Sequence, residues 1–218
     1  MGRKLIFIDC DSTLSSLEGI DELARMRGEQ TFRDCSNMTN RAMDGEIAIE
    51  AVYGARLKLI EPSREECAVI GQQYIDTIEP HVEELIAWLR DNGWTPVIVS
   101  GGLTQVIEPL AKHLGIEGLE AVDLVFNEDG SYHSFKETCP TSRMGGKIEI
   151  VEAAKAIGDV DVTVMVGDGV SDLETQDNVD LFIGYGRVVA RDKVKAEAKH
   201  FVMSLQDIPS ILAERFEV

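Results

Sequence analysis

Short apolar runs alternate with amphipathic stretches along this chain. Residues 4–8, 97–99 and 162–166 are almost continuously apolar, which is typical of strands buried on both faces of a parallel sheet. Helical patterns separate these runs, as they do in repeated βα units. We therefore expect an α/β fold, with a Rossmann-like parallel sheet as its core and helices on both faces of the sheet.

The interval between the first two strands is too long for a single crossover. Its apolar spacing predicts helices, and glycine or proline follows each of them; the four helices are residues 18–27, 30–44, 46–60 and 64–78. Ser63 is the expected N-cap of the fourth helix. Because a crossover normally uses one helix, we interpret residues 15–79 as an inserted four-helix cap domain on a core of residues 1–14 and 80–218.

Alternation of strands and helices resumes after Pro80. The pattern predicts helices over 81–91, 103–114 and 147–157 and from about residue 171. It predicts further strands over 121–126, 181–183 and 201–203. A turn at residues 127–130 leads into a hairpin return over 131–135. These elements complete the expected core.

Composition excludes several classes of function. The chain has 218 residues and a net charge of −18, which argues against nucleic acid or an anionic membrane as a partner. Its four cysteines are scattered, so neither a zinc site nor a disulfide framework is indicated. No apolar run has the length of a membrane span, and Met1–Lys4 lead directly into a strand without a signal peptide. We expect a cytoplasmic monomer or homodimer that acts on small molecules.

Three polar segments follow the three buried strands. They contain Asp9 and Asp11, then Ser100, Gly101 and Gly102, and finally residues 167–172 with Asp168, Ser171 and Asp172. Ligands of open α/β sheets bind at the carboxyl edge of the strands. Acidic pairs, a hydroxyl and glycines at that edge are what a magnesium-dependent phosphoryl-transfer site requires.

The position of Asp9 and Asp11 after a strand distinguishes this pair from a chance occurrence of the same spacing. Asp159 and Asp161 have the same spacing, but they precede a strand and are expected in a solvated turn. Asp9 and Asp11 follow one, and the alternation of side chains along a strand places both on one side. Cys10 then points away, and we expect a packed thiol there, since nothing nearby supplies a base.

Two neighbouring carboxylates can be given different tasks. We hypothesise that Asp9 binds Mg²⁺ and is the nucleophile that becomes an aspartyl phosphate. Asp11 would be the general acid and base, and its backbone carbonyl a second magnesium ligand. Asp168 would be a third ligand, with Asp172 in support. The structural alternative for this last pair is a helix N-cap with an acid in the first turn.

Two further features favour an anion site. Ser100, Gly101 and Gly102 lead into a helix, where a hydroxyl and free N–H groups form an anion cradle, although a plain strand-to-helix turn would look the same. Lys147 follows two glycines and places a cation at a helix N-terminus, where the helix dipole disfavours it. A bound phosphate would offset that cost.

Together these motifs resemble those of the haloacid dehalogenase superfamily. Residues 7–13 are similar to its first motif, 99–102 to its second, Lys147 to its third and 167–172 to its fourth. Such motifs define the superfamily and not the substrate. Four other segments make the chain similar to the phosphoserine phosphatase family within it: residues 18–24, 38–43, 56–64 and 137–141.

This resemblance implies hydrolysis of O-phospho-L-serine to L-serine and phosphate, the last step of serine biosynthesis. It implies that Glu18 binds the substrate ammonium, that Arg56 binds its carboxylate, and that Met43 packs beside it. Glu18 and Arg56 could instead form an ordinary salt bridge within the cap. Ser171 replaces a common threonine and keeps the hydroxyl, whereas Asp44 stands where glycine is often found.

Other readings remain open. Arg187 and Arg191 could help to close the site, although the sequence favours a surface position for both. The same mechanism could act on another small phosphomonoester or transfer the phosphoryl group to an alcohol. A signalling receiver also combines strand-end acids, a hydroxyl and a lysine. Receivers lack a four-helix cap and an acid–base carboxylate two residues after the phosphorylated one, so this reading ranks last.

Overall fold

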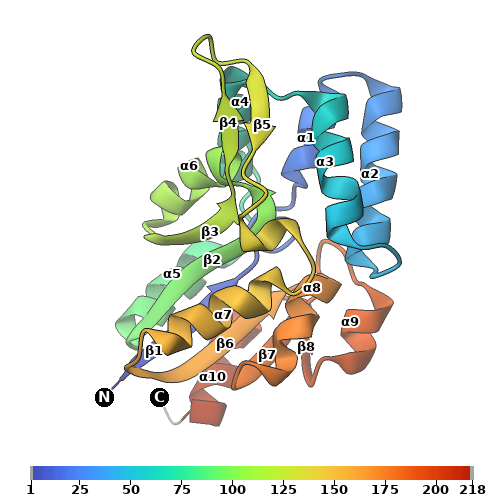
Figure 1. Cartoon of the computed structure of the whole chain (residues 1–218). Coiled ribbons are helices and arrows are strands. Elements are labelled where there is room, and N and C mark those ends of the chain that lie inside the picture. Colours follow the sequence, from blue (N-terminus) through green and yellow to red (C-terminus); the bar gives the residue numbers. More distant parts are fainter. Residues whose placement is uncertain (1, 217–218) are drawn as a thin grey trace.

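A six-stranded, fully parallel sheet forms the centre of the protein, seen in the computed structural model of residues 2–216 (Figure 1). The strand order is β3-β2-β1-β6-β7-β8. The strands are β1 (Arg3–Ile8), β2 (Trp94–Leu103), β3 (Gly118–Val122), β6 (Val160–Gly167), β7 (Leu181–Tyr185) and β8 (His200–Val202). This is the order of a doubly wound Rossmann-like sheet, and the expected fold class is confirmed.

Alternate residues of β1 pack against helices on opposite faces of the sheet. Leu5 and Phe7 belong to the apolar cluster under α7, α8 and α9, whereas Ile6 and Ile8 belong to the cluster under α5, α6 and α10. These four side chains are at most 3% exposed, as a strand buried on both faces requires. The helices are α5 (Val82–Asp91), α6 (Thr104–Leu114), α7 (Gly146–Ala156), α8 (Val170–Leu173), α9 (Asp192–Glu197) and α10 (Ile208–Phe216).

The topology reverses direction beside β1. From β1 the chain passes to β2 and β3 on one side, and it then returns to β6, β7 and β8 on the other. The loops that follow β1 and β6 therefore diverge and leave a crevice at the carboxyl ends of these two strands. Asp9 and Asp11 follow β1, and Asp168 follows β6, so both acidic segments reach this crevice.

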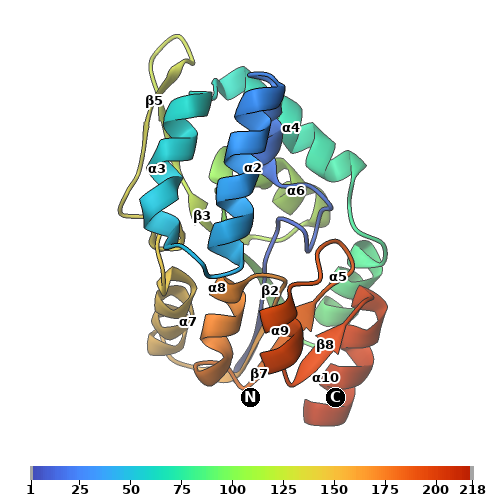
Figure 2. The same cartoon turned by 90° about the vertical axis from the view of Figure 1, so that its right-hand side faces the viewer.

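Four helices lie between β1 and β2, as expected. They are α1 (Gly19–Arg25), α2 (Glu29–Met43), α3 (Ile49–Ile60) and α4 (Arg64–Asp76). Figure 2 shows α2 and α3 above the strand ends, with α7, α8 and α9 below them. Ser63 caps α4 and forms a capping box with Glu66, which satisfies two backbone donors at the start of the helix.

The fourth inserted helix lies directly on the core. α4 packs along α6, and a side chain at Gly71 would meet Pro109 Cγ at 2.8 Å and the Val106 carbonyl oxygen at 3.1 Å. Only glycine allows the two helices to approach so closely. Because α4 packs on the core as well as belonging to the insertion, the packing does not define where the cap ends, and the boundary at residue 79 stays a prediction.

The expected single strand over residues 121–126 is wrong. The chain instead makes two short strands with Asp123 between them: β3 ends at Val122 in the main sheet, and β4 (Leu124–Phe126) begins a separate hairpin with β5 (Tyr132–Phe135). A continuous apolar run hides this change of sheet, because both strands are partly buried. The hairpin return itself is confirmed, and it projects beyond α4 in Figure 1.

Three other details differ from the prediction. β2 extends through Ser100 to Leu103, where the sequence predicts an end at residue 99, and the register shifts between Val99 and Leu103. α10 was not expected, although it buries Ile208 and Leu212 in the core. The third inserted helix begins at Ile49, three residues later than the pattern predicts.

Candidate active site

One cavity at the carboxyl ends of β1, β2 and β6 gathers nearly all of the expected site residues. Its volume is about 30 Å³, room for only one or two water molecules. The expected residues that line it are Asp9, Asp11, Glu18, Met43, Arg56, Ser100, Gly101, Gly102, Lys147 and Asp168. Asp172 and Ser171 do not line it, although Asp172 contacts a residue that does.

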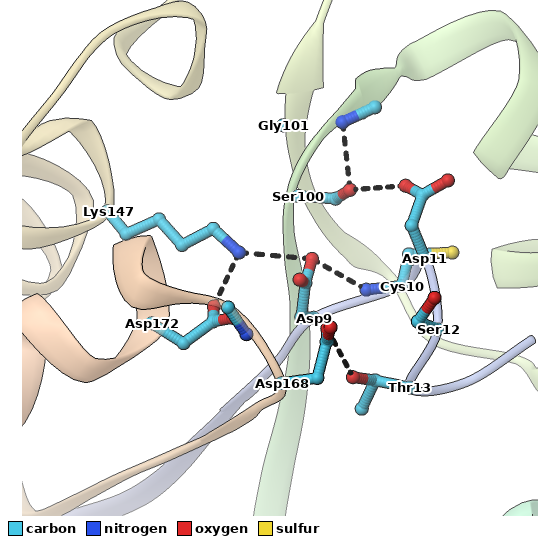
Figure 3. A network of polar contacts seen from close by, with 12 residues as sticks. Asp9, Cys10, Asp11, Ser12, Thr13, Ser100, Gly101, Lys147, Asp168 and Asp172 are labelled. Atoms are coloured by element: carbon cyan, nitrogen blue, oxygen red, sulfur yellow. Dashed lines mark hydrogen bonds and ion pairs between the residues drawn. The ribbon is translucent and has the colours of Figure 1, made fainter. Parts of the chain in front are cut away.

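Lys147 connects the two acidic segments. Its Nζ atom lies 3.0 Å from Asp9 Oδ1 and 2.5 Å from Asp172 Oδ1 (Figure 3). The lysine side chain is 4% exposed, so little solvent screens these ion pairs. Both carboxylates offset the cost of a cation at the start of α7, where the sequence alone indicated a phosphate. Although burial lowers it, the charges of Asp172 and Asp9 raise the pKa of Lys147 overall.

Asp9, Asp168 and Asp172 form a group that could hold a metal ion. Each offers a carboxylate oxygen, and these oxygens lie within 4.8 Å of one another. Burial, followed by the charge of Asp9, raises the pKa of Asp168 to about 7 and that of Asp172 well above its usual range. A bound cation would relieve this repulsion, and an oxygen-only donor set suits a hard divalent ion.

Asp11 takes part in a different set of contacts. Its Oδ1 atom accepts hydrogen bonds from the Gly19 N–H at 2.8 Å and from the Tyr74 hydroxyl, and its Oδ2 atom accepts one from the Ser100 hydroxyl at 3.0 Å. Burial and the charge of Asp9 raise the pKa of Asp11, while these donors lower it. Its carboxylate oxygens already accept three hydrogen bonds, and the role of the Asp11 backbone carbonyl as a second metal ligand stays a prediction.

The Ser100–Gly102 segment is a continuation of a strand and not a helix turn, since α6 begins only at Thr104. Ser100 Oγ accepts the Gly102 N–H at 2.9 Å. A side chain at Gly102 would stand 2.6 Å from Asp11 Oδ2, so glycine is needed there. The segment lines the cavity with Ser100, Gly101 and Gly102 all the same.

The cap contributes two charged groups that do not pair with each other. Glu18 accepts a hydrogen bond from the Ser12 hydroxyl at 2.7 Å, and Arg56 Nη1 donates to Thr39 Oγ1 at 2.8 Å. Arg56 is 3% exposed, and its Nε has no hydrogen-bond partner in the part of the chain that the structure describes. Within residues 2–216 no ion pair joins Glu18 to Arg56, which disfavours the ordinary salt bridge considered above.

The expected surface position of Arg191 is wrong. Its side chain is 3% exposed, with Nε 3.3 Å from Asp168 Oδ2 and Nη1 2.9 Å from Asp44 Oδ1. It therefore joins the acidic cluster to the turn after α2. The sequence did contain a signal for this position, because Arg191 lies six residues after the end of β7 and so near the carboxyl edge of the sheet. Arg187 is 47% exposed and pairs with Glu79.

Tyr74 is a second residue that sequence reasoning missed. It is fully buried on α4, and nothing in the local pattern separates it from the apolar residues of that helix. Two other expectations about the site are confirmed. Cys10 is fully buried, and burial raises its pKa well above the usual range; Figure 3 shows its sulfur turned away from Asp9. Asp159 and Asp161 are exposed at the other edge of the sheet as predicted, although Asp161 lies within β6 and not in the turn before it.

This fold and this arrangement of acids, lysine and strand-end glycines define a Rossmann-like phosphotransferase or phosphohydrolase of the aspartate-dependent kind. Residues 6–175 match the family model described as haloacid dehalogenase-like hydrolase. The chain belongs to this family, as the motifs predicted, and it is a hydrolase.

Two curated relatives named phosphoserine phosphatase resemble the chain over most of its length. The chain is 34% identical to the phosphoserine phosphatase of Homo sapiens, over 97% of each chain. It is 36% identical to the chloroplastic phosphoserine phosphatase of Arabidopsis thaliana, over 93% of this chain and 70% of the relative. The resemblance to phosphoserine phosphatases is therefore confirmed over nearly the whole sequence.

Solved structures extend the comparison to the fold. A phospho-aspartyl intermediate analogue of phosphoserine phosphatase superposes with a TM-score of 0.86 at 26% identity, covering 97% of this chain and 99% of that one. A substrate-bound phosphoserine phosphatase complex gives 0.84 at 26% identity, over 98% and 99%. Within residues 2–216, none of the helices combines the length and the apolar character needed to cross a membrane.

Proposed function

We propose that this protein hydrolyses O-phospho-L-serine to L-serine and phosphate through an aspartyl-phosphate intermediate, as the last step of serine biosynthesis. One observation carries the proposal: a single cavity joins the Asp9–Lys147 pair of the core to Glu18 and Arg56 of the cap. Phosphoserine has one phosphate, one ammonium and one carboxylate, and this cavity offers a counterpart to each. The relatives named phosphoserine phosphatase support the same substrate.

Mg²⁺ is the proposed cofactor. Asp9, Asp168 and the backbone carbonyl of Asp11 would hold it, with Asp172 and Ser171 in support, and the close group of carboxylate oxygens fits such an ion. When bound, magnesium neutralises charge between the phosphate and the carboxylates. Without that charge, the acidic cluster would repel the dianionic substrate.

Asp9 is the proposed nucleophile. Its carboxylate oxygen attacks phosphorus, the P–O bond to the serine oxygen breaks, and an aspartyl phosphate forms. Lys147, 3.0 Å from Asp9 Oδ1, stabilises the negative charge on the phosphoryl oxygens, and the Ser100–Gly102 segment donates hydrogen bonds to them. Asp11 donates a proton to the departing serine oxygen. It then removes a proton from the water that hydrolyses the intermediate.

Selection of the amino acid is assigned to the cap. The unpartnered Nε of buried Arg56 is suited to a substrate carboxylate. Glu18 lies near Asp11 and Asp168, and burial together with these charges raises its pKa well above the usual range, so an ammonium group would be stabilised there. Met43 lines the same cavity and would pack against the bound serine.

The protein's organisation belongs to the same proposal. Residues 15–79 would act as the cap and residues 1–14 and 80–218 as the catalytic core, in a cytoplasmic monomer or homodimer. The cavity of about 30 Å³ is too small for phosphoserine. Entry of the substrate would therefore require cap and core to separate.

Phosphate release with Mg²⁺ present tests the function. The assay compares phosphoserine with phosphothreonine, phosphohomoserine, sugar phosphates and nucleotides, each with and without an acceptor alcohol. We expect the highest kcat/KM for phosphoserine and loss of activity when the metal is chelated. A higher kcat/KM for a phosphate without an amino acid would contradict the substrate, and dominant transfer to the alcohol would contradict hydrolysis.

A further inference from the structure

The carboxylate of Asp11 is held by donors from three segments of the chain. Gly19 at the start of α1 and Tyr74 on α4 both donate to Oδ1, and Ser100 at the end of β2 donates to Oδ2. The Tyr74 side chain is fully buried, and its hydroxyl donates to Oδ1 of Asp11.

The two oxygens of Asp11 are consequently not equivalent. Oδ1 already accepts two hydrogen bonds, so a proton placed on it would point towards other donors. Among the described residues, Oδ2 accepts only from Ser100 (Figure 3), whose hydroxyl can rotate. Oδ2 is also the oxygen nearest Gly102, and both Ser100 and Gly102 line the cavity. When Asp11 is protonated, the proton therefore belongs on Oδ2, on the side of the cavity.

Gly19 makes this arrangement possible. A side chain at residue 19 would collide with the Tyr74 hydroxyl, since its Cβ would stand within 3.0 Å of the ring. The same residue supplies the backbone N–H that donates to Oδ1. Two segments inserted after β1 thus converge on one oxygen of one carboxylate, and among the described residues the Tyr74 hydroxyl makes no competing hydrogen bond.

We propose that Tyr74 is a positioning residue that acts through Asp11: it keeps Oδ1 as an acceptor and so directs the transferable proton to Oδ2. The inference rests on the acid–base role of Asp11 in the proposed function. It adds a residue outside the four motifs.

The test is Tyr74→Phe, which keeps the ring and removes the donor. Single-turnover experiments measure formation of the phospho-enzyme alone. With phosphoserine, whose alkoxide needs a proton, we expect a rate about 10-fold to 100-fold lower, part of the usual contribution of acid–base catalysis. With p-nitrophenyl phosphate, whose leaving group departs without a proton, the rate should change less than about 3-fold. KM for phosphoserine should stay within about 2-fold.

Tyr185→Phe is the matched control. Tyr185 is also fully buried, and its hydroxyl donates to the carboxylate of Glu79, away from the cavity. Both variants lose a comparable hydrogen bond, so thermal melting should show similar destabilisation, while Tyr185→Phe keeps its single-turnover rate. Equal loss of rate in the two variants, or equal losses on both substrates for Tyr74→Phe, would assign Tyr74 a merely structural role and overturn the inference.

Asp11→Asn separates this inference from the mechanism beneath it. If Tyr74 acts through Asp11, adding Tyr74→Phe to Asp11→Asn should lower the residual rate less than about 2-fold. A multiplicative loss in the double variant would overturn the inference alone. An Asp11→Asn variant with normal phosphoserine turnover would instead overturn the proposed mechanism.

Discussion

Two buried cations, one in the core and one in the cap, have opposite surroundings. Lys147 is 4% exposed and lies against the carboxylates of Asp9 and Asp172. Arg56 is 3% exposed, yet its described hydrogen bond goes to the neutral hydroxyl of Thr39, and its Nε has no partner. The core cation thus touches carboxylates directly, whereas the cap cation reaches a carboxylate only through Thr39, whose hydroxyl donates to buried Asp21 at 2.7 Å. The guanidinium of Arg56 is therefore the less fully paired of the two cations, and a ligand carboxylate can still be added to it.

The largest effect on activity is expected from a substitution in the core. Asp9→Asn removes the nucleophile and should lower kcat for phosphoserine by at least about 10⁴-fold. It also removes one of three crowded carboxylates, so the free energy of unfolding without metal should stay equal or rise. Activity and urea denaturation measure the two effects. A variant that is both inactive and unfolded would show that Asp9 is structural.

Removal of the cap cation Arg56 should change the preference for phosphoserine over other phosphates. Arg56→Ala should lower kcat/KM for phosphoserine by about 30-fold to 10³-fold, because a buried partner of the substrate carboxylate is worth roughly 2–4 kcal/mol. The same variant should lose less than about 3-fold on an aryl phosphate, which has no carboxylate. Equal losses on the two substrates would remove the carboxylate assignment.

Loss of the Arg191–Asp44 ion pair, which joins the core to the cap, should have a smaller effect on kcat/KM. Asp44 is 47% exposed and accepts from Arg191 at 2.9 Å. A half-exposed ion pair contributes up to about 1 kcal/mol, so Asp44→Gly should lower kcat/KM by about 2-fold to 5-fold and reduce its dependence on salt. Asp44→Asn, which keeps the size of the side chain, is the control. A rate above that of the parent protein would mean that the added carboxylate impedes the site.

The smallest effect concerns an ion pair far from the chemistry. Arg27 lies 2.6 Å from Glu66 and lowers the pKa of Glu66 from 4.5 to about 2. The folded protein therefore holds this stabilisation above pH 4.5 and loses it as the pH falls towards 2. Glu66→Gln keeps the capping box with Ser63. Urea unfolding should show a difference of about 0.5–1 kcal/mol between parent and variant at pH 6, shrinking at pH 3.

The sequence predicted the core site better than the contacts of the cap. The core site lies at strand ends, and parallel topology is enough to bring Asp9 and Asp168 to one edge. Lys147 was found by a different signal, a cation at the start of a helix. The break at Asp123 was missed because adjoining partly buried strands have the same apolar pattern in one sheet or in two. α10 was missed because its pattern is short, with Pro209 in its first turn.

Contacts between elements that are distant in the sequence could not be predicted from its pattern. Tyr74 reads as an ordinary apolar helix position, and its contact with Asp11 exists only because α4 crosses the end of β1. Arg191 follows β7, but its burial depends on Asp44, which a helix turn brings from 147 residues away. Spacing along the chain carries no information about such pairs. The roles of Glu18, Arg56 and Met43 depended on resemblance for the same reason.

The close approach at Gly71 has a consequence for engineering and for evolution. Because α4 is seated on α6 through a position that accepts only glycine, its sequence is constrained by the core and not by the substrate. Gly19 at the start of α1 is needed for the Tyr74–Asp11 contact as well, so the part of the insertion that can be exchanged is α2 and α3, between Gly28 and Ser63. A chimera cut there would inherit a foreign specificity while it retains the tyrosine that serves Asp11.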